Sequence, residues 1–134
     1  MENHHFDDFD FTINDDRESV RDLLNMKFKQ RCKRMKRRGE QYIYKEQSKY
    51  ASDILSAFKN NIHLSTFVAP VQWGKTGVII SLIHKCCTDE TLFINPNNVL
   101  VITGMSDNEW KQQTKKRLIK EFRPAVNHLH GILN

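Results

Sequence analysis

The sequence predicts an α/β fold in which a small parallel sheet follows an α-helical N-terminal extension. Residues 15–59 carry two helical patterns of apolar side chains, and apolar runs at 62–68 and 99–103 flank a helix that is apolar on nearly every side. An order of strand, helix, strand, helix and strand is typical of parallel sheets with right-handed crossovers. We therefore divide the chain into an acidic flexible arm (1–16), a helical extension that holds a basic helix (17–60) and an incomplete α/β domain (61–134).

Composition excludes several classes of protein. The 134 residues are 39% hydrophobic and 28% charged, which is enough apolar material for one core and too much for a wholly disordered chain. No apolar run approaches the roughly 18 residues of a membrane span, and the acidic N-terminus lacks the basic-then-apolar order of a secretory signal. Three cysteines without metal-ligand spacing indicate reduced thiols. We expect an intracellular protein with no membrane partner.

The first helix is predicted to begin near Asp15, where Glu18 completes a box-like cap, and to stop at Gly39. Its apolar side chains recur at helical spacing: Val20, Leu23, Leu24 and Phe28. Its second half is strongly basic, because eight of the twelve residues from 27 to 38 are Lys or Arg. Such a stretch either binds a polyanion such as nucleic acid, with Arg34, Arg37 and Arg38 as candidates, or is only a solvated helix face.

The remaining elements follow from periodicity and from helix caps. A second helix is predicted over 41–59, and its apolar side chains share one face: Ile43, Tyr50, Ala51, Ile54, Leu55 and Phe58. The α/β part is then predicted as a strand (62–68), a buried helix (75–87), a loop (88–98), a strand (99–103), a helix that ends before Pro124 (106–122) and a third strand (126–130).

A phosphate-loop motif lies between the first predicted strand and the buried helix. The pattern is Gly, any four residues and Gly-Lys-Ser/Thr, and residues 69–76 fit it with Ala in place of the first Gly. Gly74 lets the backbone approach a phosphate, Lys75 supplies a cation for the β- and γ-phosphates, and Thr76 supplies a hydroxyl for Mg²⁺. The motif predicts ATP and Mg²⁺ as cofactors, with Lys75 and Thr76 as the catalytic candidates and Thr76 as the metal ligand.

The predicted nucleotide-binding residues are those of the motif and the glycine after it: Ala69, Pro70, Val71, Gln72, Trp73, Gly74, Lys75, Thr76 and Gly77. Trp73 is an unusual residue for such a loop. It could stack on a base, but a bulky apolar side chain more often packs on a neighbouring helix, so we expect Trp73 to pack on the second helix.

Residues 68–77 resemble the first motif of superfamily 2 helicases, which often reads Ala-Pro-Thr-Gly-Ser-Gly-Lys-Thr. Residues 99–113 resemble the next segment of that family, where Trp110 and Gln113 match a Leu/Trp-x-x-Gln pattern. The resemblance covers about residues 40–131 and has the character of helicases from large DNA viruses or phages. It implies a partial RecA-like P-loop sheet, an ATP-dependent helicase or NTPase, nucleic acid (DNA or RNA) as a partner, and a location in a host cell or a virion.

The resemblance also implies roles for individual residues. In the family, the loop and helix start after the second strand touch the nucleic-acid backbone, which implies Thr103, Gly104 and Ser106 here. A glutamine upstream of the phosphate loop sometimes reads adenine in the family, and Gln47 is the nearest match.

One departure from the family limits the expected activity. Helicases need an Asp-Glu pair on a later strand to hold Mg²⁺ and activate water, and no acidic pair follows a predicted strand after Thr76. Asp89 and Glu90 fall in a loop, and Asp107 and Glu109 open a helix. We therefore expect this chain alone to hydrolyse ATP poorly or not at all, with a separate C-terminal motor domain or other viral proteins as partners.

Two other functions compete with a helicase segment. One is a non-catalytic nucleic-acid-binding or virion structural module derived from a helicase, in which the basic helix carries the function. The other, a small nucleotide kinase, is disfavoured because such enzymes need an Arg-rich lid for which the chain leaves no room.

Overall fold

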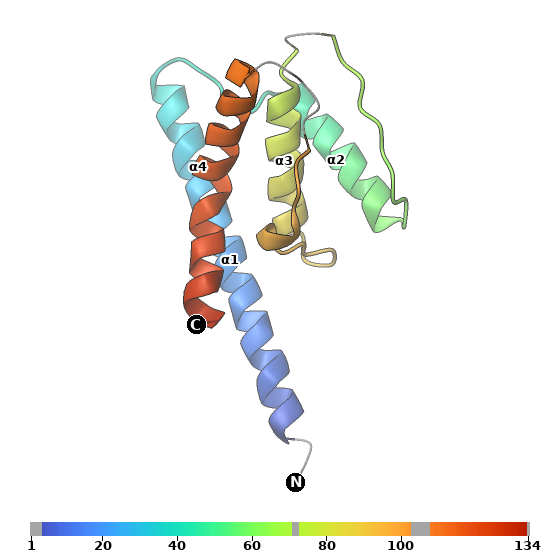
Figure 1. Ribbon diagram of the computed structural model, residues 1–134, viewed down its shortest axis with the longest axis vertical. Helices are drawn as coiled ribbons and strands as arrows, with labels where there is room; N and C mark the ends of the chain where they lie inside the picture. The colour runs from blue at the N-terminus through green and yellow to red at the C-terminus, as the bar shows by residue number, and fades with distance from the viewer. Residues whose placement is uncertain (1–3, 71–72, 103–107, 134) are drawn as a thin grey trace.

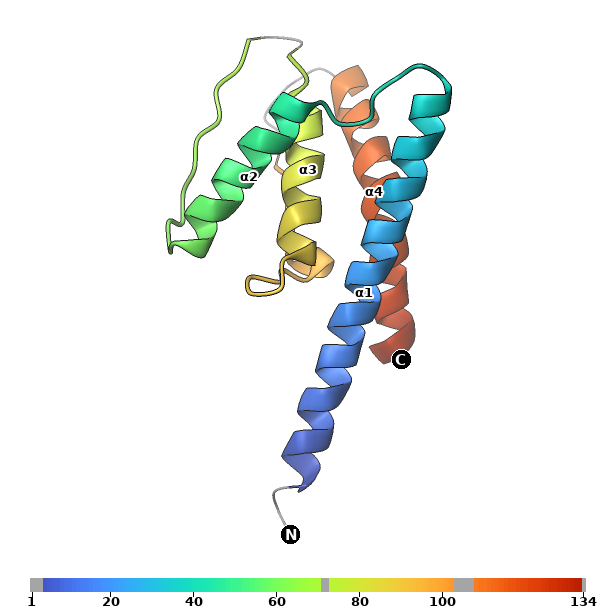
Figure 2. The ribbon, with the colours of Figure 1, turned by 180° about the vertical axis from the view of Figure 1, so that it is seen from behind.

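The computed structural model describes residues 4–70, 73–102 and 108–133, and these residues form a helical structure (Figure 1). The elements in chain order are α1 (His4–Arg37), α2 (Lys45–Lys59), α3 (Lys75–Thr88), the 3₁₀ turn η1 (Pro96–Asn98) and α4 (Asn108–Leu133). α1 and α4 lie side by side and run in opposite directions, while α2 packs on α3 (Figures 1 and 2). α3 therefore lies between α2 on one side and the α1–α4 pair on the other, and it contacts all three helices.

The predicted α/β fold with a parallel sheet is wrong, because the described residues contain no strand. The runs 62–68 and 99–102 are extended but form no strand pair with any other described residues, and residues 126–130 continue α4 instead of forming a third strand. A strand is stable only when another strand takes up its backbone hydrogen bonds. Here the helices build the core by packing on one another; of the extended runs, only 99–102 touches it, through Val99 and Val101.

The predicted helices are present, with shifted ends. α3 matches the expected helix 75–87 to within one residue, whereas α2 ends at Lys59 as predicted but begins at Lys45, four residues later than the predicted start at 41. α1 begins at His4 rather than near Asp15, and it ends at Arg37, two residues before Gly39, which is left-handed with φ +74°. Within the described ranges, no helix is long and apolar enough to cross a membrane.

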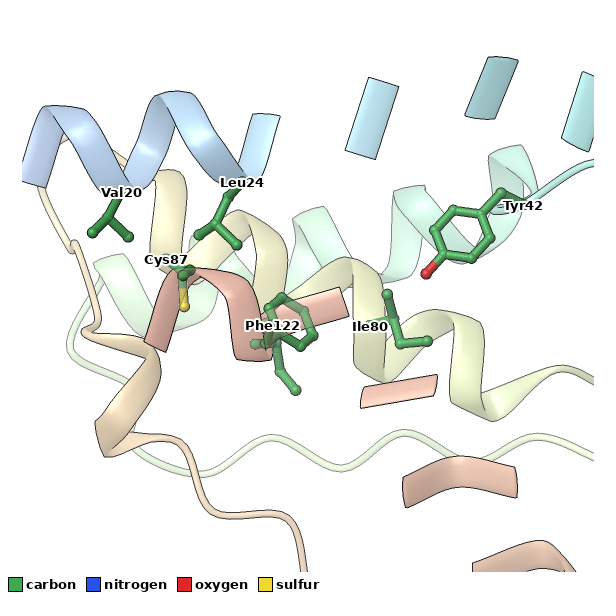
Figure 3. Close-up of a cluster of buried hydrophobic side chains, with 8 residues drawn as sticks. Val20, Leu24, Tyr42, Ile80, Cys87 and Phe122 are labelled. Atoms are coloured by element: carbon green, nitrogen blue, oxygen red, sulfur yellow. The ribbon is translucent and has the colours of Figure 1, made fainter. Parts of the chain in front are cut away.

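The core lies where α1, α3 and α4 meet, and Figure 3 shows its central side chains. Its buried members are Val20, Leu24, Tyr42, Ile80, Ile83, Cys87, Phe122 and Ala125. Cys86 and Cys87 are free, buried thiols near the end of α3, as small apolar residues would be. Burial raises the pKa of the Cys86 thiol to about 11 and that of the Cys87 thiol to about 12.

α4 runs through Pro124, although a helix end was predicted just before this residue. Proline has no N–H, so the carbonyl of Lys120, four residues earlier, loses its intrahelical partner. Arg31 of α1 supplies a replacement, since its Nη2 donates to that carbonyl at 3.2 Å. The hydrogen bond from Arg31 of α1 thus offsets the intrahelical hydrogen bond that Pro124 removes from α4.

Candidate functional site

The phosphate-loop motif forms the turn that enters α3. Gly74 is the N-cap, in the left-handed conformation at φ +91° and ψ +38°, and the helix begins at Lys75. The Trp73 N–H donates to the carbonyl of Pro70 at 3.3 Å, and the Gly77 N–H donates to that of Gly74 at 3.0 Å. Such a turn places the positive end of a 14-residue helix at the motif, which is what the motif's chemistry requires.

Gln47 of α2 lies against this turn. Its side chain is 6% exposed, its Nε2 donates to the Gly74 carbonyl at 2.8 Å, and its Oε1 accepts from the Tyr44 N–H at 2.7 Å. The glutamine thus caps the start of α2 and ties α2 to the motif. Gln47 is the residue that the family resemblance implied as a reader of adenine. In the structure it reaches the motif, and its observed hydrogen bonds are to backbone groups.

Gly74 of the motif and Gly77, directly after it, make room for Gln47. A Cβ on Gly74 would lie 2.4 Å from Gln47 Nε2, and a Cβ on Gly77 would lie 2.5 Å from the same atom. Both distances are far below van der Waals contact. Sequence reasoning explained Gly74 by phosphate approach alone, whereas in the structure both glycines also admit a side chain from α2.

Trp73 packs on α2, as expected. Its ring centroid lies 5.5 Å from that of Tyr50 in an edge-on arrangement and 5.7 Å from that of Phe67. Tyr50 and Phe67 are themselves 5.1 Å apart. The three rings hold Phe67, just before the motif, and Trp73, within the motif, against α2.

The motif's chemical side chains are accessible. Lys75 is exposed, and Thr76 and Ala69 are half-buried. Val71 and Gln72 lie outside the described residues, as do Thr103, Gly104 and Ser106, which were predicted to touch nucleic acid. The described part of the motif therefore offers a helix N-terminus, one ammonium group and one hydroxyl, a set of groups suited to a phosphate.

The basic residues predicted from sequence lie where α1 meets α4. Arg34, Arg37 and Arg38 are exposed at the C-terminal end of α1. The facing part of α4 is basic as well, with four exposed cations among its middle residues: Lys115, Lys116, Arg117 and Lys120. Because the helices are antiparallel (Figure 2), the basic stretches 27–38 and 111–123 run alongside each other. The sequence shows that both stretches are rich in Lys and Arg, but not that they are neighbours.

A buried charged cluster joins these two stretches. The Arg31 guanidinium pairs with the Glu121 carboxylate, which is 1% exposed, and the Tyr42 hydroxyl donates to the same carboxylate at 2.7 Å. Burial, followed by the hydrogen bond to Glu121, raises the pKa of Tyr42 to about 12. Nothing in the sequence marked this cluster, because its members are 11 to 90 residues apart.

The acids Asp89 and Glu90 lie in the turn after α3, as predicted, and both are used in structural contacts. Asp89 accepts from the Leu92 N–H at 2.9 Å and pairs with Lys59 at 3.2 Å, while Glu90 pairs with Arg21 at 3.4 Å. The hydrogen bond from Leu92, helped by Thr91 and Lys59, lowers the pKa of Asp89 to about 2. This pair binds α1 and α2 to the end of α3.

Comparison with family models, curated proteins and solved structures finds no match to this chain.

Proposed function

We propose that the chain binds the phosphates of a nucleoside triphosphate at the turn 69–77, as the ATP-binding segment of a protein like the superfamily 2 helicases. The observation that carries the proposal is the left-handed Gly74 at the N-cap of α3, directly before Lys75 and Thr76. The motif requires a loop that leads directly into a helix, and a helix N-terminus binds anions through its free N–H groups.

The residues of this turn suit the phosphates of Mg²⁺-ATP better than they suit its metal ion. Lys75 would pair with the phosphates, and Gln47 would hold the Gly74 carbonyl away from them. Thr76 is one hydroxyl ligand for Mg²⁺, which usually keeps several waters and takes its remaining ligands from phosphate. We infer nucleotide binding with little or no hydrolysis by this chain, and a further motor domain or viral protein as its partner.

Calorimetric titration with Mg²⁺-ADP tests the proposal. Lys75→Ala should abolish the heat of binding, since no uncharged side chain replaces the ammonium group. Lys49→Ala removes the same charge from an exposed position on α2 and should leave binding unchanged. Equal affinity of the wild type and of Lys75→Ala for Mg²⁺-ADP would refute nucleotide binding at this turn.

A second function has its own observation, the pairing of the basic stretches of α1 and α4. Cations on two adjacent helices attract a phosphate backbone without reading sequence, and their binding weakens steeply with salt. This supports the alternative of a nucleic-acid-binding module, and it is equally compatible with the helicase-like interpretation. The setting for either function is inside a host cell or a virion.

Fluorescence anisotropy with labelled DNA and RNA over a salt series tests this function. Neutralising Arg34, Arg37 and Arg38 to Gln should weaken binding and flatten its salt dependence. The control neutralises three lysines of α2: Lys45, Lys49 and Lys59. If both triple variants weaken binding equally, only net charge matters and the α1–α4 stretches are not a binding surface.

A further inference from the structure

Residues 62–68 form an extended segment, and none of the other described residues pairs with it as a strand. Within the described part of the molecule, the backbone of residues 63–69 makes no hydrogen bond. The segment runs along the outer side of α2, at the margin of the molecule (Figures 1 and 2). Unpaired N–H and C=O groups along an extended backbone form a ready template for another strand.

The two faces of the segment differ in the manner of a strand. Phe67 turns inward, where its ring meets Tyr50 of α2. Ile62, Leu64 and Val68 turn outward and are 49%, 83% and 86% exposed. Residues 62–66 and 68 are all exposed and Phe67 is half-buried, so the apolar side chains of Ile62, Leu64 and Val68 are open to a second strand.

The sequence of the segment is close to self-complementary. In an antiparallel pair with a two-fold axis at Ser65, Ile62 faces Val68 and Leu64 faces Thr66, so apolar and β-branched side chains meet along the outer face. The same axis keeps α2 of both copies on one face of the ribbon. Residues 60–74 contain no Asp, Glu, Lys or Arg, so two copies of a chain with net charge +5 would bring no like-charged Lys or Arg side chains together along this segment.

We infer that residues 62–68 are a dimerisation strand, which pairs antiparallel with residues 62–68 of a second copy. A second extended segment, 99–102, also exposes apolar side chains, with Leu100 at 81% and Ile102 at 83%. Val99 and Val101 of this segment pack against the core, whereas Ile62, Leu64 and Val68 of the first segment are all exposed. The self-complementary segment 62–68 is therefore the one that pairs.

Sedimentation equilibrium and infrared spectroscopy of the full chain, each over a range of concentrations, test the inference. The expected result is a dimer whose strand signal rises together with the dimer fraction. Leu64→Lys combined with Val68→Lys should weaken association by at least about tenfold, because like charges would then face the partner strand. Ser65→Pro removes one backbone donor at the centre of the pair and should weaken association as well.

The matched control is Leu100→Lys combined with Ile102→Lys. It adds the same charge at side chains that are equally exposed, and it should leave dimerisation unchanged. Circular dichroism checks that every variant keeps its helix content. Three results would overturn the inference: the mass of a single copy at all concentrations, a dimer without strand signal, or a control variant that weakens association as much as the 64/68 variant.

Discussion

The α1–α4 pair and the α2–α3 pair are held together by different means. Between α1 and α4, a guanidinium group is buried against a carboxylate and a carbonyl that Pro124 leaves free. Between α2 and α3, the contact is close, with Gln47 filling the space above Gly74 and Gly77. The first contact depends on charge and the second on the absence of two Cβ atoms.

The two helix pairs should therefore be destabilised by different kinds of substitution. Removing one member of a buried ion pair leaves an uncompensated charge, whereas a close helix contact fails when atoms are added. The α1–α4 contact should therefore respond to neutralisation, and the α2–α3 contact to a single methyl group.

The largest effect is expected for Arg31→Met. Glu121 is then buried without its counter-ion, and its Oε1 atom already has no hydrogen-bond partner among the described residues. Loss of one partner from a buried pair costs about 3–5 kcal/mol, and urea unfolding measures the loss. In a Pro124→Ala background the same substitution should cost less, because the Lys120 carbonyl regains a helical N–H. Identical losses in both backgrounds would mean that Arg31 does not serve that carbonyl.

A pH titration of stability tests the side of α3 that faces α1. His84 stacks on Phe28 with ring centroids 4.5 Å apart, and burial, with Lys85 adding to it, lowers its pKa from 6.5 to about 4. The unfolded chain therefore binds a proton between pH 6.5 and 4 that the folded chain does not, so stability should fall as pH falls through this range, by up to about 3 kcal/mol. His84→Phe keeps a ring on Phe28 without titrating, and the slope should flatten in that variant. A slope unchanged by His84→Phe would assign the pH dependence to other groups.

The helices could be predicted from sequence and the sheet could not, for a physical reason. Apolar periodicity is local, so both α2 and α3 could be predicted from sequence, α3 to within one residue and α2 with a start four residues too early. Whether the run 62–68 becomes a strand depends on a partner that periodicity does not reveal. The helix end predicted before Pro124 was wrong for the same reason. The side chain that compensates for this proline belongs to Arg31, which lies 93 residues earlier in the sequence.

The candidate site likewise combines a feature that the sequence predicts with contacts that depend on tertiary structure. The motif 69–76 was predicted because its spacing is itself the signal, and Gly74 and Lys75 stand where the motif puts them. The second role of Gly77, to admit Gln47, follows from a contact across 30 residues and is visible only in three dimensions. The pairing of the two basic stretches is likewise a result of tertiary packing.

Gly77→Ala sharpens the comparison on the α2–α3 side. The new Cβ would displace Gln47, which loses its bonds to Tyr44 and Gly74, at a cost of about 1–2 kcal/mol in thermal unfolding. In a Gln47→Ala background the same change should stabilise the protein by about 0.5–1 kcal/mol, because alanine favours a helix over glycine. The sign of the effect thus reports whether Gln47 occupies the gap, and a destabilisation that persists without Gln47 would contradict the close contact.

The smallest effect is expected at Asp89, in the turn where both pairs meet. Asp89→Asn keeps an oxygen that accepts from the Leu92 N–H and loses only the charge opposite Lys59, so it should cost well below about 1 kcal/mol. Asp89→Ala also removes the acceptor and should cost about 1 kcal/mol. Because the folded pKa of Asp89, about 2, is below its ordinary value of 3.8, the stabilisation is present above pH 4 and is lost as pH falls towards 2. This window lies below that of His84, so one acid titration of the wild type, His84→Phe and Asp89→Asn separates the two groups. If Asp89→Asn flattens the slope between pH 6.5 and 4 instead, the assignment of the two windows is wrong.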